Sequence, residues 1–165
     1  MVGDGSYLMM HTELVTAVAE KLKLIVVLIQ NHGYASIGAL SEQLGSQRFG
    51  TQYRTLDAEH HSFDDGEKLP IDLALNAESL GVKVIRVAPG ENVIAELEAA
   101  VRAAKAAPEN GGPVLIHVES DPLLDAPSSE SWWDVPVSEV SELESTQRAY
   151  TTYTDNKSRQ RTLLG

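Results

Sequence analysis

Two short polar stretches near the start of the chain carry the residue types of a metal and phosphate site. Residues 3–6 read Gly-Asp-Gly-Ser and residues 31–33 read Asn-His-Gly, so that Asn31 stands 27 positions after Asp4. Asp4 offers a carboxylate oxygen, Asn31 an amide oxygen and Gly33 a backbone carbonyl. Mg²⁺ accepts such oxygens and completes its octahedron with phosphate oxygens and water. The two stretches therefore predict a site for a metal-bound diphosphate.

The glycines and the serine of the first stretch suit the phosphate side of such a site. Gly3 and Gly5 permit a tight turn and a close approach of the backbone to a ligand. If a helix starts here, the N–H groups of Gly5 and Ser6 are free to face an anion. An amide at position 31 in place of a second carboxylate is favourable, because the diphosphate itself brings negative charge.

The elements between the two stretches would place both at one edge of a sheet. Residues 11–23 have helical spacing, with Leu14, Val15 and Leu22 on the side that would cover the sheet. Residues 24–29 form a continuous apolar run that is typical of a buried parallel strand. A strand, a helix and a strand in this order form a βαβ unit. Its loops emerge at the carboxyl ends of the strands, where open α/β sheets bind ligands.

The rest of the chain continues this alternation. Residues 34–69 have no sustained period and predict a long loop, with short helical turns around residues 37–44. The order helix, strand, helix, strand then follows over residues 70–80, 82–87, 91–107 and 113–118. This order predicts an α/β fold, a three-layer parallel sheet with helices on both faces.

Past the last strand the pattern is less regular. A connector over residues 121–131 precedes Trp132 and Trp133, of which at least one is expected to pack against the domain, and a role in closing the active site or in a subunit contact stays open. A short amphipathic helix is predicted over residues 137–143. Because the end of the chain is polar, we predict a domain over residues 1–150 and a frayed, polar C-terminal tail over residues 151–165.

The chain also begins abruptly. Only Met1 and Val2 precede the glycine turn, whereas a buried parallel strand normally has several residues. We therefore expect the domain to be truncated at its N-terminus.

The spacing of the two polar stretches resembles that of a known cofactor site. Gly-Asp-Gly, with Asn 27 positions after its Asp, resembles the diphosphate-binding motif of thiamine diphosphate (ThDP) enzymes. Three segments more narrowly resemble the trihydroxycyclohexane-dione hydrolases of inositol breakdown, and the likeness covers most of residues 1–150. These segments are GDGSYLMMHTEL at 3–14, FGTQYR at 49–54 and SWWDVPVSEVS at 131–141.

The resemblance implies a ThDP-binding fold with ThDP and Mg²⁺ as cofactors. The metal ligands would be Asp4, Asn31 and the backbone carbonyl of Gly33. The full set of cofactor-binding residues would be Gly3, Asp4, Gly5, Ser6, Asn31, Gly33 and Tyr34.

The resemblance also implies an activity. The cofactor's carbanion would add to a ketone of a cyclic 1,2-diketone, a ring C–C bond would break, and water would release 5-deoxy-glucuronate. ThDP enzymes activate the cofactor with a glutamate from another domain. No residue of this chain takes that role, so no catalytic residue is assigned and the chain by itself is expected to be inert. Active sites of this family lie between subunits, so the complete protein is expected to be a homodimer or tetramer.

Two other functions stay open. The chain could belong to an acetolactate-synthase-like carboligase or decarboxylase, or it could be a detached, non-catalytic ThDP-binding module. A nucleoside triphosphate site is not indicated, because no Gly-Lys-Ser/Thr follows the glycine turn. A dinucleotide site is not indicated either, because Leu8 stands where its pattern requires a third glycine.

Composition narrows the partners. The net charge of −11 argues against nucleic acid and against anionic membrane surfaces. The longest apolar run is too short for a bilayer span, and without cysteine there is neither a disulfide nor a thiolate metal site. We expect a cytoplasmic protein, and the resemblance implies that it acts on a small molecule.

The histidines are assigned no role in the site. Side chains of adjacent residues such as His60 and His61 do not share one face of a helix or strand, so we expect a solvated loop rather than a metal site. A lone histidine in a strand, as at His117, is usually a hydrogen-bonded core or edge residue. His11 lies at the start of the first predicted helix.

Overall fold

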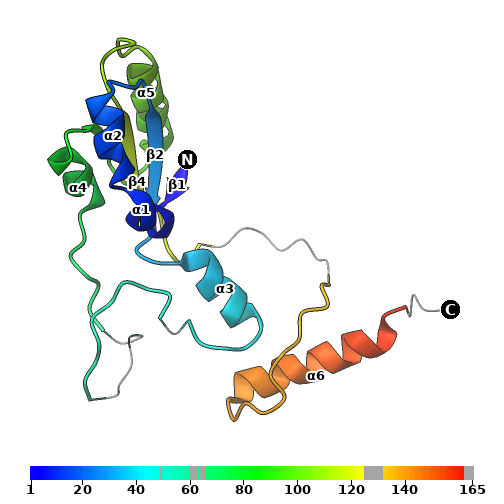
Figure 1. The fold of residues 1–165 in the computed structure, drawn as a ribbon. Coiled ribbons are helices and arrows are strands. Elements are labelled where there is room, and N and C mark those ends of the chain that lie inside the picture. Colours follow the sequence, from blue (N-terminus) through cyan, green and yellow to red (C-terminus); the bar gives the residue numbers. More distant parts are fainter. Residues whose placement is uncertain (49, 60–62, 64–65, 125–131, 162–165) are drawn as a thin grey trace.

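The computed structural model describes residues 1–48, 50–59, 63, 66–124 and 132–161 of the chain. Its centre is a four-stranded, wholly parallel sheet in the order β1-β2-β4-β3 (Figure 1). The strands are β1 (Val2–Gly3), β2 (Ile25–Gln30), β3 (Lys83–Val87) and β4 (Val114–Glu119). The three strands predicted in full are therefore confirmed to within a residue or two at each end.

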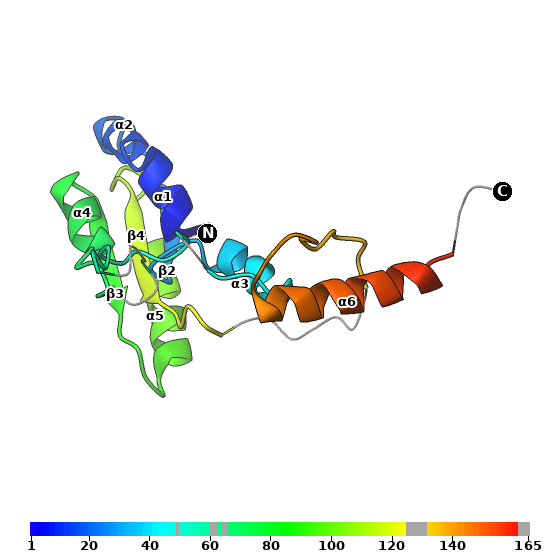
Figure 2. The ribbon, with the colours of Figure 1, turned by 90° about the horizontal axis from the view of Figure 1, so that it is seen from below.

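Helices cover both faces of this sheet (Figure 2). On one face, α1 (Asp4–Met10), α2 (Glu13–Ala19) and α4 (Leu73–Ser79) pack on one cluster of buried apolar side chains. On the other face, α5 (Val93–Lys105) packs on a second cluster. Successive strand residues alternate between the two clusters, as a pleated strand requires. The predicted three-layer α/β architecture is confirmed.

The register of the strands brings the two polar stretches together. Gly3, the last residue of β1, pairs with Ile29 of β2, and Gln30 at the end of β2 pairs with Glu119 at the end of β4. Because all strands run in parallel, their carboxyl ends lie at one edge of the sheet. Asp4 and Asn31 directly follow two neighbouring strands at that edge.

The predicted helix over residues 11–23 is wrong in its bounds. The chain turns helical at Asp4, bends at His11 and Thr12, and continues as the short helix α2. Val15 and Leu22, which we expected to cover the sheet, are about half exposed, at 50% and 47%. The break at His11 rotates the second helix relative to the first, so a single helical stripe does not describe the buried face.

The two later helices that cover the sheet, α4 and α5, differ less from the prediction. The helix predicted over residues 70–80 begins only at Leu73, because the side chain of Asp72 accepts a hydrogen bond from the Leu75 N–H at 2.7 Å and caps the helix there. The helix predicted over residues 91–107 is α5.

The C-terminal predictions are corrected more strongly. No helix forms over residues 137–143, and residues 151–159 are not frayed, because α6 (Glu144–Arg159) is a continuous helix that lies apart from the sheet (Figure 2). Two ion pairs four residues apart support it, Glu144 with Arg148 and Asp155 with Arg159. Trp132 packs near Tyr153 of α6, with ring centroids 6.4 Å apart, rather than on the sheet.

The long loop after β2 begins with a helix. α3 (Ala35–Gln43) confirms the helical turns expected near residues 37–44. The end of this helix is tied to α6, since the hydroxyls of Ser145 and Thr146 both donate to the carbonyl of Gly45. The paired histidines, His60 and His61, lie outside the described residues. None of the helices in the described part of the chain has the length and apolar character that a bilayer crossing needs.

Candidate functional site

Asp4 is the centre of the site. It stands where β1 passes into α1, and it is almost completely buried, with 1% of its surface exposed. Its Oδ2 accepts hydrogen bonds from the N–H groups of Asn31 at 3.1 Å and Gly33 at 3.2 Å. Its Oδ1 accepts one from the N–H of Gly5 at 2.8 Å. A buried carboxylate is stable here because three donors face it.

This geometry brings the predicted metal ligands together but changes one detail. The Gly5 N–H, expected to be free for an anion, instead donates to the neighbouring carboxylate. The Asp4 side chain thus accepts hydrogen bonds from both polar stretches and links the first to the second.

The oxygens of three residues can converge on one point. One terminal atom of the Asn31 amide lies 3.3 Å from Asp4 Oδ1 and 2.9 Å from the carbonyl oxygen of Gly33. If that atom is nitrogen, it donates to both oxygens. If the amide is turned so that it is oxygen, that oxygen lies at these distances from the oxygens of Asp4 and Gly33. With metal–oxygen bonds of about 2.0–2.1 Å, adjacent ligands of an octahedral Mg²⁺ lie about 2.9 Å apart, so the residues present fit the ion.

The backbone of the second stretch is what aims these oxygens. His32 has a left-handed φ of 59°, which is uncommon for a residue other than glycine. Its carbonyl accepts from the Tyr53 N–H at 2.8 Å, and the Tyr34 N–H donates to the Thr51 carbonyl at 2.7 Å. These bonds fasten the turn to the facing loop.

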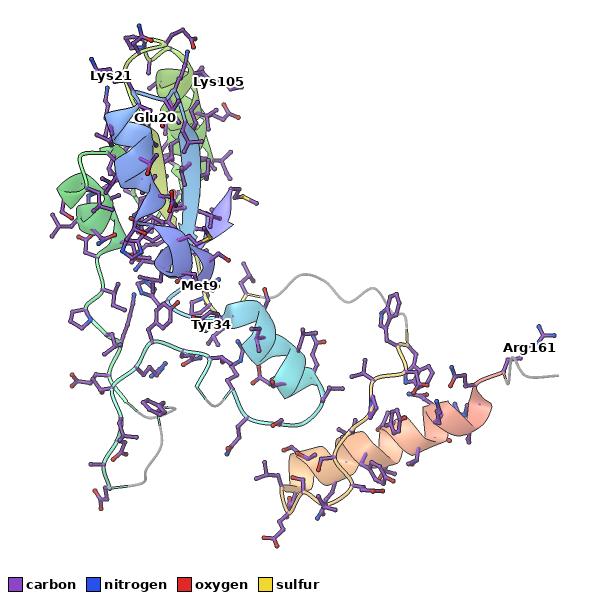
Figure 3. All side chains as sticks on the ribbon, viewed as in Figure 1. Met9, Glu20, Lys21, Tyr34, Lys105 and Arg161 are labelled. Carbon is purple, nitrogen blue, oxygen red and sulfur yellow. The ribbon has the colours of Figure 1, made fainter. Side chains whose placement is uncertain are left out.

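Two of the glycines are required by close contacts. A Cβ at Gly33 would lie 2.2 Å from the Thr51 carbonyl oxygen, which only glycine avoids. A Cβ at Gly5 would lie 2.5 Å from the ring of Tyr34. Figure 3 shows the Tyr34 side chain between α1 and the start of α3. At Gly3 a Cβ would meet nothing, so its residue type has no steric cause in this chain.

All seven residues predicted to bind the cofactor line one hollow of about 210 Å³. They are joined there by the first turn of α3. The full lining is Gly3, Asp4, Gly5, Ser6, Asn31, Gly33, Tyr34, Ala35, Ser36 and Ile37. Within the described part of the chain, no group of three or more His, Asp or Glu side chains could hold a metal. A cation bound in this hollow would therefore meet one carboxylate and otherwise neutral oxygens.

Sequence reasoning missed a second polar cluster, on the other side of the same turn. Gln30 is 1% exposed, and its Oε1 lies 2.7 Å from His117 Nε2. Its Nε2 donates to the Ile71 carbonyl at 3.0 Å and lies 3.1 Å from His32 Nδ1. His32 Nε2 lies 3.7 Å from a Glu119 oxygen.

Burial is the main cause that lowers the pKa of both imidazoles, His32 and His117. For His32 the positive charge of Lys68 lowers the pKa further, while the carboxylates of Glu119 and Asp4 oppose the shift. The signal in the sequence was a glutamine that ends an apolar strand, but nothing local shows that its partner lies on β4. His117 itself has the predicted character of a hydrogen-bonded core histidine.

Comparison with known families shows which kind of domain this chain contains. Residues 1–118 match the model of the thiamine pyrophosphate enzyme, C-terminal TPP binding domain. The chain belongs to this family. The motif that suggested a diphosphate site thus lies in a domain of the kind that binds thiamine diphosphate.

Relatives within the family narrow the comparison. The chain is 38% identical over 150 residues to the 3D-(3,5/4)-trihydroxycyclohexane-1,2-dione hydrolase of Bacillus subtilis, a match that covers 91% of this chain and 21% of the relative. It is 38% identical over 156 residues to hydrolase 2 of the same name from Bacillus cereus, covering 94% of this chain and 23% of the relative. The chain thus spans about a fifth of the length of these relatives.

A solved structure supports the fold. The ThDP-dependent 4-hydroxybenzoylformate decarboxylase of Rhodococcus jostii superimposes with a TM-score of 0.52 at 23% identity, over 73% of this chain and 19% of that one. At this identity the similarity concerns the fold alone.

Proposed function

We propose that this chain holds the diphosphate of ThDP through a Mg²⁺ ion bound by Asp4, Asn31 and the backbone carbonyl of Gly33. The observation that supports the proposal is that one terminal atom of the Asn31 amide lies 3.3 Å from Asp4 Oδ1 and 2.9 Å from the Gly33 carbonyl oxygen, so that the three ligand groups adjoin one another. Asp4 supplies the charge, and the other two oxygens are neutral. Four further lining residues of this hollow, Gly3, Gly5, Ser6 and Tyr34, would surround the diphosphate.

Asp4 and Gly5 would each contribute to binding in a different way. Asp4 fixes the turn by accepting from the Asn31 and Gly33 N–H groups with Oδ2, and its Oδ1, which accepts from the Gly5 N–H, would be the oxygen offered to the metal. Gly5 allows the Tyr34 ring to approach α1 closely. When bound, ThDP supplies a nucleophilic carbon that adds to a substrate carbonyl.

For the complete protein we propose hydrolysis of 3D-trihydroxycyclohexane-1,2-dione to 5-deoxy-glucuronate in inositol catabolism. The support is the 38% identity to hydrolases of that name over nearly the whole chain. The protein would work in the cytoplasm as a homodimer or tetramer. Since no residue here is assigned to activate the cofactor, the chain by itself binds ThDP but does not turn over substrate.

Calorimetric titration of the chain with ThDP tests the proposal. With Mg²⁺ present we expect saturable binding, and with a chelator in excess we expect none. Absence of binding at millimolar ThDP and Mg²⁺, by a chain that is folded by circular dichroism, would overturn the metal–diphosphate site. The substrate is tested separately, on the complete protein, by comparing turnover of the cyclic diketone with turnover of pyruvate. Turnover of pyruvate alone would favour a carboligase or decarboxylase.

A further inference from the structure

A second hollow, of about 340 Å³, lies beside the proposed diphosphate site at the carboxyl ends of β2, β3 and β4. It shares no lining residue with the first, because the turn of residues 31–33 separates them. Of its ten lining residues, seven are polar or charged and three are apolar. The lining is Gln30, His32, Lys68, Leu69, Pro70, Ile71, Asp72, Arg86, His117 and Glu119.

One backbone carbonyl fixes the hydrogen positions in this hollow. The Ile71 carbonyl can only accept, so the Gln30 atom 3.0 Å from it must be the NH₂ group. The other amide atom of Gln30 is then oxygen, and His117 must donate to it from Nε2 at 2.7 Å. The same NH₂ group faces His32 Nδ1 at 3.1 Å, so Nδ1 is unprotonated and the hydrogen of this imidazole is on Nε2.

These assignments leave hydrogen-bonding capacity unused. His32 Nε2 is buried and has no hydrogen-bond partner among the described residues. The nearest acceptor, Glu119 Oε1, is 3.7 Å away, which is too long for a direct hydrogen bond. Because Nε2 is buried, a hydroxyl group reaches it only when a neighbouring side chain turns aside; it would then accept from the imidazole and donate to the carboxylate. His117, protonated on Nε2, has an acceptor at Nδ1.

The charges in the hollow balance. Arg86 forms an ion pair with Asp72 at 3.1 Å, and the other two charged lining residues are Lys68 and Glu119. Two cations and two carboxylates give the wall no net charge, so it does not select an ion of either sign. Donors and acceptors stand side by side, which is the arrangement that matches hydroxyl groups, because each hydroxyl both donates and accepts.

We infer that this hollow is a subsite for a neutral, polyhydroxylated small molecule, with one hydroxyl held between His32 Nε2 and Glu119. Its use as a substrate subsite rests on the proposed function, whose substrate is a hydroxylated ring. The subsite itself is defined by Gln30, which sets both imidazoles, and by the charge balance of the wall. Binding of such a molecule needs no metal.

Nuclear magnetic resonance of the histidine side chains tests the inference on the chain as it stands. The probe is myo-inositol, a fully hydroxylated neutral ring, and gluconate is the anionic comparison. We expect saturable shifts at His32 Nε2 and His117 Nδ1 and none at His11, which lies on the exposed end of α1. Gluconate should bind at least fivefold more weakly than myo-inositol.

Glu119→Gln removes the charged acceptor, and it should weaken myo-inositol binding at least fivefold. The matched control is Glu98→Gln on α5, whose carboxylate pairs with Arg102 on the other face of the sheet and should leave binding unchanged. Equal affinities of the wild type and both variants, absent shifts, or tighter binding of gluconate would overturn the subsite.

The failure of the subsite can be told from failure of the proposed function, because ThDP and Mg²⁺ are titrated into the same samples. If myo-inositol binds as described and the cofactor does not, the subsite stands without the proposed function. If the cofactor binds and the polyol does not, the inference is refuted alone.

Discussion

Asp4→Asn is the sharpest test of the proposed metal site, because it removes the charge and keeps the shape. The Asp4 carboxylate accepts two N–H groups with Oδ2 and one with Oδ1. An asparagine at position 4 would place its oxygen where Oδ2 is now, because that atom faces two N–H donors. An NH₂ group at the same place would face those two donors with no acceptor. The NH₂ group then meets the Gly5 N–H and points at the proposed metal position. Leaving that one donor unsatisfied costs about 1–3 kcal/mol of stability.

The effect on metal binding is larger. Loss of an outer partner of a metal ligand typically weakens binding about 10–100-fold. Asp4 is the only charged ligand proposed and its replacement directs hydrogens at the cation, so we expect a loss of more than about 100-fold. That loss corresponds to more than about 2.7 kcal/mol. Calorimetric titration of ThDP at fixed Mg²⁺ measures it, with the unfolding temperature recorded on the same preparation.

The matched control is Asp155→Asn, which makes the same chemical change in an exposed ion pair of α6. This variant should bind the cofactor with the affinity of the wild type. Asn31→Leu provides a second variant, in case Asp4→Asn fails to fold. It removes one proposed ligand oxygen and no charge. If either variant is folded and binds Mg²⁺–ThDP within threefold of the wild type, the three-oxygen site is refuted.

Three further predictions concern stability, measured by urea unfolding. Gly33→Ala should lose about 1–3 kcal/mol, because its Cβ would lie 2.2 Å from a backbone carbonyl of the facing loop, whereas Gly3→Ala should change little. Leu28→Ala, in the core at 0% exposure, should lose about 2–5 kcal/mol, and Leu75→Ala, at 57% exposure, should lose far less. Burial lowers the pKa of His117, so the unfolded chain binds the extra proton first as the pH falls below about 6.5. The stability that this neutral histidine confers is present above that pH and lost below it. The free energy of unfolding should therefore change less between pH 7 and pH 5.5 in His117→Asn than in the wild type.

The sequence predicted those parts of the fold whose cause is local. The apolar run that became β2 is continuous, which is typical of a strand covered on both faces. The residue types on either side of this run predicted the site. Asp4 and Asn31 follow neighbouring strands because a βαβ unit places them so, and the structure confirms that they meet.

What the sequence could not predict depends on contacts between distant residues. α6 has a polar sequence, and its packing partners, Trp132 and the end of α3, precede it by ten residues or more. The local sequence of α6 carries no sign of these contacts. Likewise, Gln30 meets His117 only because β2 and β4 are paired in one particular register. That register is a property of the sheet and not of either strand.

His32 explains why the two hollows occur together. A left-handed residue other than glycine costs roughly 1–2 kcal/mol, so the conformation needs support from its surroundings. The Tyr53 N–H supports its carbonyl and the Gln30 amide supports its ring. This backbone conformation sends the Asn31 amide and the Gly33 carbonyl to the Asp4 side and the imidazole to the opposite side. The buried amide of Gln30 that sets the histidine tautomers therefore also steadies the turn on which the proposed metal site depends.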